Sequence, residues 1–326
     1  MYKKINIKIL LALFVVLLIL VLVIFYFESK KGERSFRADI FDADTSKVTS
    51  VVIYPRINKE ESINIIKEGT QWKIDYHGKL LNADNDIVKN MFSTLLELKP
   101  RRIAATERSR WREFEVDDSL STRVQVLTQK KIVSDLYIGK FSYQQPKNQM
   151  QYNYNQRGTM STCVRLADEN IVYVVDGFLS MAFNRNVNDF RNNSIIRSNK
   201  SDWTRLSFRY PADSSFTLVK EGDKWMVDGL MADSASVDKY FNSISYLTNS
   251  NFVDDQKPLN DQPVLSLKIE GNNFGEPIQV KAFIADTINK YLITSSLNKG
   301  AYFSGEASKL TGKIFVGKAG FFSNNE

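Results

Sequence analysis

The sequence predicts an α+β protein in which an N-terminal transmembrane helix precedes two tandem repeats, each a mainly antiparallel sheet with one packed amphipathic helix. Two observations predict this architecture. Ile9 to Phe27 form an apolar run without a charge, and the phrase KEGTQWKID at Lys67 to Asp75 returns as KEGDKWMVD at Lys220 to Asp228. The chain has 326 residues, of which 43% are apolar, and this is enough for two ordinary cores.

The apolar run from Ile9 to Phe27 is long enough to cross a hydrocarbon core of about 30 Å as a helix. It ends in the bulky residues Phe25 to Phe27 instead of small residues, so we expect an uncleaved anchor that contacts the lipid bilayer. Lysines and arginines flank both ends in similar number, so charge alone leaves the orientation open. Because a short N-terminal tail usually stays in the cytoplasm, we expect a single-pass inner (cytoplasmic) membrane protein with a periplasmic C-terminal region.

The repeat extends well beyond its opening phrase. SINIIKEG (62–69) corresponds to SFTLVKEG (215–222), and VVIYP ending at Pro55 corresponds to SFRYP ending at Pro211. We therefore predict a cytoplasmic tail and transmembrane signal anchor at 1–28, a polar linker at 29–46, a first repeat at 47–198 and a second repeat at 199–326.

Each copy begins with a predicted β-hairpin. Ile63 and Ile65 alternate with polar residues, as in a half-buried strand, and the same alternation occurs in the second copy. A Glu-Gly pair provides the turn, where glycine can take positive φ. Trp72 and Trp225 then occupy the returning strands, so each hairpin has a tryptophan on one face.

An amphipathic helix follows each hairpin. Asp84 and Asp233 stand at the predicted N-caps, and apolar residues follow at helical spacing. The two stripes are Val88, Met91, Phe92 and Leu95, and Val237, Tyr240, Phe241 and Ile244. Each stripe needs a surface to cover, and the nearest one is the tryptophan face of the hairpin. Further strands are predicted at 123–127, 133–139, 162–166 and 171–175, and at 264–269, 278–284, 290–294 and 301–305.

The repeated residues make turns, caps and cores, so the repeat predicts folding and not chemistry. Asp75 and Asp228 are the acids that recur within the phrase, and we expect them to end their strands. Searches for nucleotide-binding, nucleophile-elbow and metalloprotease motifs find none, and we predict no catalytic, cofactor-binding or metal-binding residue.

The metal-ligating side chains are too few for most transition-metal sites, because the chain has one cysteine, Cys163, and one histidine, His77. Calcium would need more oxygen ligands than the sequence groups together. The acidic pairs Asp84 with Asp86 and Asp254 with Asp255 are therefore predicted to be solvated caps and loop charges.

The stretch from Lys99 to Phe114, KPRRIAATERSRWREF, is the most basic part of the chain. Its counterpart in the second copy, NSNFVDDQKP, is acidic, so the basic stretch is not part of the shared fold. Its candidate partner-contact residues are Arg101, Arg102, Arg110, Trp111 and Arg112. The alternative is a solvated edge with Trp111 turned into the core. The net charge of +7 is a mild excess, and we predict no nucleic-acid partner.

Taken together, the anchor and the duplicated E-G-x-x-W-x-[IV]-D, A-D and helix motifs resemble a bacterial family of membrane-anchored domains of unknown function, the DUF4340 type. DLYIGKF, the stretch from Cys163 to Val175 and the D-F-R of Asp189 to Arg191 fit the same pattern. Members are often found beside ABC-type transport systems and gliding-motility auxiliary components. The resemblance implies an envelope location and an accessory role, and it supplies no catalytic residues.

The leading hypothesis is a membrane-anchored extracytoplasmic binding or scaffolding protein, an accessory component of a membrane transport or motility assembly, with a membrane protein as partner. The alternative is an envelope hydrolase that acts on cell-wall or surface glycans through carboxylates without a recognisable spacing. A third hypothesis is capture of a small solute between the two repeats.

Overall fold

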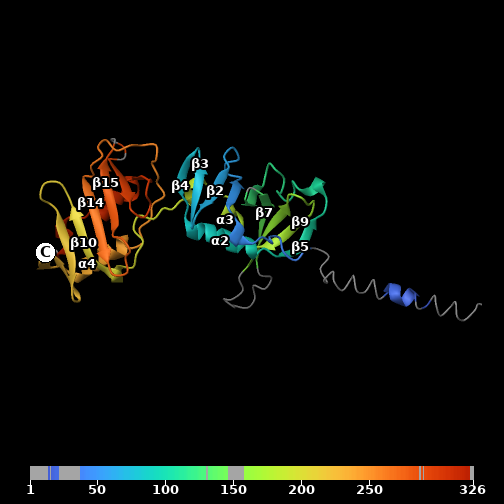
Figure 1. Ribbon diagram of the computed structural model, residues 1–326, viewed down its shortest axis with the longest axis horizontal. Helices are drawn as coiled ribbons and strands as arrows, with labels where there is room; N and C mark the ends of the chain where they lie inside the picture. Colours follow the sequence, from blue (N-terminus) through green and yellow to red (C-terminus); the bar gives the residue numbers. More distant parts are fainter. Residues whose placement is uncertain are drawn as a thin grey trace, which may run out of the picture.

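The computed structural model of the protein describes residues 14, 16–21, 37–129, 131–145, 158–285, 288 and 290–323. These residues form two antiparallel sheets with few helices, which confirms the predicted α+β class. Figure 1 shows the sheets in two units that follow one another along the long axis of the molecule. They are called the first unit and the second unit below.

The first unit is one antiparallel sheet with the strand order β4-β3-β2-β1-β6-β7-β8-β9-β5. The helices α2 (Asn85–Leu96) and α3 (Ser180–Phe183) pack on one face of it and bury the main core. The strands are β1 (Ser50–Tyr54), β2 (Ile63–Glu68), β3 (Gln71–Tyr76), β4 (Lys79–Asn82), β5 (Pro100–Ala105), β6 (Thr122–Thr128), β7 (Lys131–Gln144), β8 (Thr159–Leu166) and β9 (Val172–Asp176).

The second unit repeats this plan with the strand order β13-β12-β11-β10-β14-β15-β16-β17. The helices α4 (Ser234–Ile244) and α5 (Leu310–Ile314) contribute to its core. The strands are β10 (Trp203–Arg209), β11 (Phe216–Glu221), β12 (Lys224–Val227), β13 (Leu230–Met231), β14 (Leu265–Gly271), β15 (Ile278–Ile284), β16 (Tyr291–Ser295) and β17 (Phe303–Ser304). In place of β5, a single bridge joins Phe252 to Phe303 at the edge of the sheet.

The predicted contact between hairpin and helix is confirmed in both units. The ring centres of Trp72 and Phe92 lie 5.6 Å apart, and those of Trp225 and Phe241 lie 4.9 Å apart in an edge-to-face arrangement. The caps are also as predicted, because the Asp84 carboxylate accepts from the N–H groups of the first turn of α2 and Asp233 does the same for α4. The duplicated tryptophans are therefore packing residues.

The two repeated aspartates differ in role. Asp228 ends its strand as expected, at φ 46°, where its carboxylate accepts from the Thr217 N–H at 2.9 Å and binds Lys318 at 2.7 Å. Asp75 does not end its strand, because it lies inside β3 opposite Leu80. In the first unit β3 continues to Tyr76, and the chain turns into β4 at His77 and Gly78. The two aspartates are still equivalent in register, because Asp75 pairs with Asn64 and Asp228 donates its N–H to the Thr217 carbonyl, so they differ in backbone conformation and not in position.

The Tyr-Pro motifs of the two units are shifted by one residue relative to each other. The core residue Ile53 pairs with Ile63, whereas the core residue at the same place in the second unit is Phe208, which pairs with Phe216. Tyr54 is therefore equivalent to Arg209 and not to Tyr210. The shared tyrosine and proline conceal this offset in the sequence.

The predicted transmembrane segment, Ile9 to Phe27, lies mostly outside the described residues. Phe14 and residues 16–21 of it are helical and exposed. Within the part of the chain that the structure describes, no helix is long and apolar enough to cross a membrane. In the predicted linker at 29–46, Ile40 and Phe41 are buried in the core of the first unit.

The chain passes between the units through residues that pack on both. Phe190 belongs to the first core, and Ile195 and Ile196 belong to the second, a few residues before the predicted boundary at 198. Between them, the Arg191 guanidinium binds Asp254 at 2.6 Å and lies 3.5 Å from the ring centre of Phe252. Arg191 is a buried charge, so the pair is needed to offset its desolvation.

Further polar contacts bridge the same junction. Arg197 binds Asp86 at 2.6 Å, Lys79 Nζ lies 3.3 Å from Asp255, and the Asn82 side-chain amide donates to Asn298 at 3.0 Å. The predicted acidic pairs thus have structural partners: Asp84 caps α2, and the other three carboxylates bind cations across the junction. The expectation of solvated loop charges is wrong for Asp254, which is largely buried.

Replacing Phe241 with alanine should leave a cavity between Trp203 and Trp225, whose rings lie 4.8 and 4.9 Å from it. We expect the free energy of unfolding to fall by about 3–5 kcal/mol. Urea unfolding followed by tryptophan fluorescence measures the change. Tyr246→Ala is the matched control, because Tyr246 is exposed and should lose little. An equal loss in the two variants would contradict the packing role of Phe241.

Candidate functional site

The helices cover one face of each sheet, so the opposite, outer face decides what each unit can contact. On the first unit this outer face carries a second apolar cluster that includes Val116, Tyr137, Cys163 and Val174. Residues 106–121, called the strap below, connect β5 to β6 and pack on this cluster through Trp111 and Phe114. The outer face of the first unit is therefore covered by the chain itself over β5, β7, β8 and β9.

A row of alternating arginines and aromatic rings crosses the first sheet beneath the strap. The Arg123 guanidinium lies 5.1 Å from the ring centre of Tyr137. Arg165 lies 4.0 Å from the same ring and 3.7 Å from the ring of Trp111. Arg165 is buried and donates to the Val116 carbonyl at 3.2 Å and to the Leu166 carbonyl at 3.0 Å. It therefore joins the strap to the sheet through cation–π and hydrogen-bond contacts.

The strap comes so close to β7 that only glycine fits below it. A Cβ on Gly139 would lie 2.3 Å from the Phe114 carbonyl oxygen and 2.7 Å from that of Glu115. The Lys140 N–H donates to the same Phe114 oxygen at 2.9 Å. Phe283 occupies the equivalent position in the second unit, so that sheet cannot hold a strap in the same way.

The predicted partner-contact residues lie on β5 and the strap. Trp111 is half-buried and donates its indole N–H to the Asn170 carbonyl at 2.9 Å, which matches the alternative of a tryptophan turned inward. Arg101 binds Asp176 at 2.5 Å, and Arg110 binds Glu113 through two hydrogen bonds of 2.9 Å. Arg102 and Arg112 are exposed and have no ion pair among the described residues. The five side chains do not converge on one cavity.

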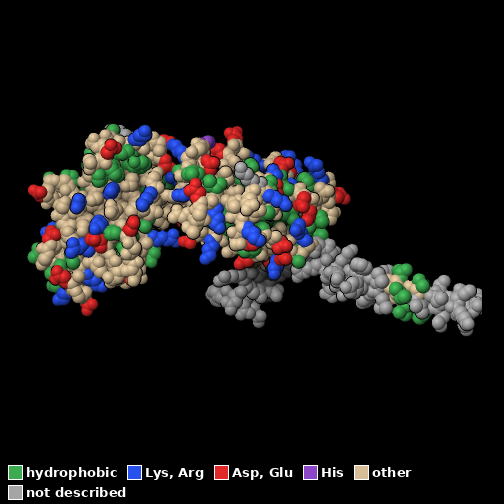
Figure 2. Space-filling view, in the orientation of Figure 1, with side chains coloured by type: hydrophobic (Ala, Val, Ile, Leu, Met, Phe, Trp, Pro, Cys, Tyr) green, Lys and Arg blue, Asp and Glu red, His purple; other side chains and the backbone are tan. Residues whose placement is uncertain are grey.

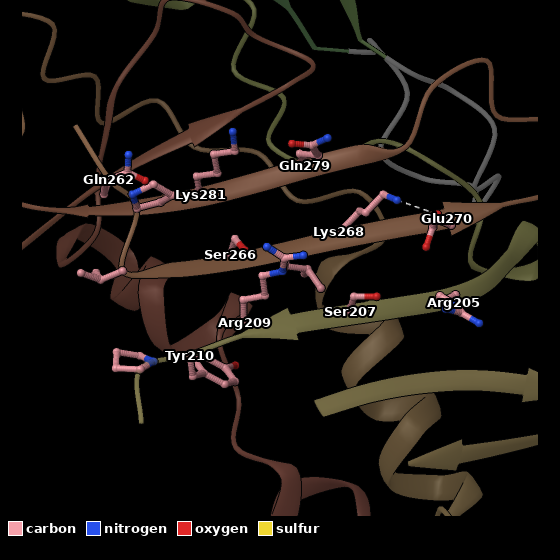
Figure 3. A pocket seen from close by; sticks show the side chains of 14 residues that line it. Arg205, Ser207, Arg209, Tyr210, Gln262, Ser266, Lys268, Glu270, Gln279 and Lys281 are labelled. Carbon is pink, nitrogen blue, oxygen red and sulfur yellow. Dashed lines mark hydrogen bonds and ion pairs between the residues drawn. The ribbon is translucent and has the colours of Figure 1, made fainter. Parts of the chain in front are cut away.

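The outer face of the second unit is different, because a hollow of about 990 Å³ lies over β10, β14 and β15. Figure 3 shows the side chains that line it, standing on the same face of three neighbouring strands. The cations among them are Arg205, Arg209, Lys268 and Lys281, and these four residues are called the basic face below. The connection from α4 to β14 supplies one wall through Gln262 and Pro263.

Most of the charge on the basic face is uncompensated. Glu270 binds Lys268 at 2.7 Å, as the dashed line in Figure 3 marks. Arg205, Arg209 and Lys281 have no ion pair within the described ranges. Figure 2 shows that cations and carboxylates are otherwise interspersed over the visible surface of both units. The basic face is therefore a local departure from a mixed surface.

The corresponding region of the first sheet carries a carboxylate that neutralises its cation. There Arg123 forms two hydrogen bonds with Asp135, at 2.8 and 2.6 Å. By strand register, Asp135 pairs with Gln125 and its equivalent Gln279 pairs with Lys268. The carboxylate of the first unit is thus replaced by a neutral amide in the second.

The hollow contains groups that bind and few that could react. Ser207, Ser266 and Gln279 can donate and accept hydrogen bonds beside the cations. Of the described residues that line the hollow, Glu270 is the one carboxylate, and none is a histidine. The arrangement can hold a carboxylate or phosphate together with neutral polar groups.

The sequence contains a signal for this face that the repeat analysis missed. Arg205, Ser207 and Arg209 alternate with core residues along β10, and Ser266, Lys268 and Glu270 do so along β14. A strand was predicted at 264–269, whereas the β10 region was recognised only as part of the repeat, and the polar residues of the two segments were not considered together. Only the pairing of β10 with β14 brings the two rows side by side.

The remaining residues weighed for chemistry are dispersed. His77 is exposed, in a turn at φ 50°, and its Nε2 lies 3.5 Å from a Glu61 oxygen. Cys163 is buried, and burial raises the pKa of its thiol. No group of three or more His, Cys, Asp or Glu residues that could hold a metal ion occurs among the residues that the structure describes.

Comparison with known proteins gives one match. The family model described as Domain of unknown function (DUF4340) matches residues 72–263. The matched range begins at Trp72 in β3 and ends just before β14, so it includes the strap, the junction and both helices with duplicated caps. No curated protein and no solved structure matches the chain.

Replacing Gly139 with alanine should displace the strap, because the new Cβ would meet two backbone oxygens below 3 Å. We expect a loss of about 1–3 kcal/mol in the free energy of unfolding, together with increased fluorescence quenching of Trp111. Gly317→Ala is the control, since nothing lies within 4 Å of its built Cβ. Equal stability of the two variants would show that the strap is not held closely to β7.

Removing the Asp135 carboxylate should make the free energy of unfolding less dependent on pH in the acidic range. Burial opposes its ionisation, but hydrogen bonds from Arg123 and Gln125 outweigh this and hold the pKa of Asp135 below its ordinary value. The stabilisation is therefore complete above about pH 4, the usual value in an unfolded chain, and is lost as the pH falls through the lower folded value. We expect Asp135→Asn to cost about 1–3 kcal/mol at pH 7.

The measurement is the difference in unfolding free energy between the natural protein and Asp135→Asn, taken from urea titrations at several pH values. The difference should shrink progressively below about pH 4. Asp261→Asn, which removes an exposed carboxylate, should show little difference at any pH. A constant difference for Asp135→Asn down to pH 2 would mean that the carboxylate charge is not its source.

Proposed function

We propose, from the premise that this chain belongs to the DUF4340 family of domains of unknown function, that it is a membrane-anchored binding or scaffolding protein. Its two sheets face the periplasm, and it serves as an accessory component of a membrane transport or motility assembly. The observation that carries the binding role is the basic face, where three cations lack a carboxylate partner within the described residues.

The anchoring part of the proposal is supported by the sequence of the N-terminal region. Ile9 to Phe27 contain no charge and are long enough for a hydrocarbon core of about 30 Å. The described chain joins the first unit at Ile40, whose N–H donates to the Leu98 carbonyl at 3.2 Å. Twelve residues, 28–39, would thus separate the end of the apolar run from Ile40, which would hold the first unit near the bilayer.

The binding part is supported by the excess of positive charge at the hollow. Arg205 and Arg209 on β10 and Lys281 on β15 share one sheet face, and none of them has an ion pair within the described residues. Such a face is electrostatically complementary to an anionic partner. The role in transport or motility rests on the family resemblance of the duplicated motifs.

The proposal is tested by photo-crosslinking in cells. A photo-reactive amino acid at Ser207 or Gln279 should give a reproducible adduct with a membrane-assembly component, because both side chains line the hollow. Positions Lys220 and Lys239 are matched controls on the second unit, exposed and away from the hollow. A reporter fused after Glu326 tests the periplasmic orientation. Absence of adducts at the hollow, or the same adducts at the controls, would contradict the binding role.

A further inference from the structure

The two units share one sheet plan but differ in what covers the outer face. The first sheet carries the strap, and the second carries the hollow over the basic face. We propose that the basic face binds an acidic polypeptide segment of a partner protein, laid across β10, β14 and β15. This inference rests on the proposed binding function and specifies the chemistry of the partner.

The strap shows what kind of segment this sheet plan accepts. Its part at 113–118, EFEVDD, has four carboxylates and no cation. Glu115 forms an ion pair with Arg56, which follows β1, and Lys59 Nζ donates to the Asp118 carbonyl at 2.6 Å. Phe114 and Val116 supply the apolar contacts. An acidic segment with an apolar anchor therefore lies on β7 and β8 and beside the loop after β1. Of these strands, β7 is the equivalent of β15, which lies under the hollow.

The row beneath this segment changes character in the second unit. In the first unit the cross-strand neighbours are Tyr54, Arg123, Tyr137 and Arg165. In the second they are Arg209, Ser266, Lys281 and Thr294. The aromatic members are replaced by cations, and the arginines by hydroxyl groups. In the first row both arginines contact aromatic rings and Arg123 also binds Asp135, whereas Arg209 and Lys281 of the second row have no ion pair within the described residues.

The neutral groups of the hollow favour a polypeptide over other anions. Ser207, Ser266 and Gln279 can bind the carbonyl and N–H groups of a peptide backbone, while the cations bind acidic side chains. A phosphodiester group offers only acceptors, whereas a peptide backbone offers N–H donors as well as carbonyl acceptors. The mixture of charged and neutral groups therefore matches a chain that carries both.

The position of the hollow argues against the membrane surface as the occupant. The chain joins the first unit at Ile40, and Figure 1 shows the second unit at the other end of the molecule, beyond β4 of the first unit. The strap of a second copy is not available either, because Arg165 and the sheet of its own unit hold it. A separate acidic partner remains.

The test measures binding of synthetic peptides to the full-length protein in nanodiscs of zwitterionic lipid. The first probe is the acidic part of the strap, residues 113–121. The second is the same peptide with the carboxylates at 113, 115, 117 and 118 replaced by amides. Labelled peptide is titrated with protein, and the dissociation constant is read from fluorescence anisotropy.

The test variant removes three charges from the basic face, Arg205→Gln, Arg209→Gln and Lys281→Gln. The matched control removes three exposed cations elsewhere on the second unit, Lys220→Gln, Lys224→Gln and Lys239→Gln. We expect the natural protein and the control variant to bind the acidic peptide equally, and the test variant to bind it about tenfold more weakly. The amide peptide should bind the natural protein about tenfold more weakly than the acidic peptide does. Circular dichroism checks that each variant is folded. If the triple variant misfolds, the single variant Arg209→Gln replaces it, and we expect its affinity for the acidic peptide to fall about twofold.

The other outcomes distinguish failure of the peptide-binding inference from failure of the proposed binding function. Peptide binding that is equally strong in the test and control variants would overturn the inference. Binding of phosphatidylglycerol vesicles that depends on the basic face, without peptide binding, would also overturn it but would leave the proposed binding function intact. If neither probe responds to the basic face and the crosslinks at Ser207 and Gln279 are absent, the proposed function fails as well.

Discussion

The contact between the hairpin tryptophan and a helix phenylalanine determines which face of each sheet is buried. Trp72 meets Phe92 in the first unit, and Trp225 meets Phe241 in the second. Because side chains alternate along a strand, this contact also fixes which residues point to the opposite face. The row through Arg123 and the basic face are both consequences of that assignment.

The second consequence is that the two outer faces could diverge without any change in the fold. In the first unit Gly139 admits the strap, and Asp135 neutralises Arg123. In the second unit Phe283 and Gln279 hold the equivalent places. A few substitutions on one side of the sheet thus convert a self-covered surface into one that carries uncompensated charge, while the helix-covered core keeps its residues.

Local patterns were sufficient to predict the hairpins, the caps and both helices, because these depend on neighbours close in sequence. Asp84 and Asp233 were identifiable from the turns they begin. Strand order was not predictable, since β1 lies between β2 and β6 and its neighbour β6 follows only after a helix and the strap. The candidate site depends on that order. Arg209 and Lys281 are far apart in sequence, and the register of β10, β14 and β15 brings them to one row.

The same limit explains the misjudged residues. Tyr54 and Tyr210 occur at the same place in the repeated sequence, but their strand registers differ by one residue. Such an offset moves a side chain to the other face of the sheet, and sequence similarity cannot detect it. Asp254 was expected in solvent, but it pairs with Arg191, which lies on a different element and becomes adjacent only at the junction. Basic residues drew attention to Lys99 to Phe114 because they are contiguous there, whereas the cations of the basic face are interleaved with core residues.

The junction can transmit a mechanical force from one unit to the other. Arg191 is buried against Phe252 and bound to Asp254, and residues on both sides of it are anchored in different cores. To separate the units, a force on the second unit would have to expose the paired charge of Arg191. It would also have to break the contacts made by Asn82 and Arg197. Load applied at the far sheet would therefore travel through folded structure to the point where the chain leaves the first unit.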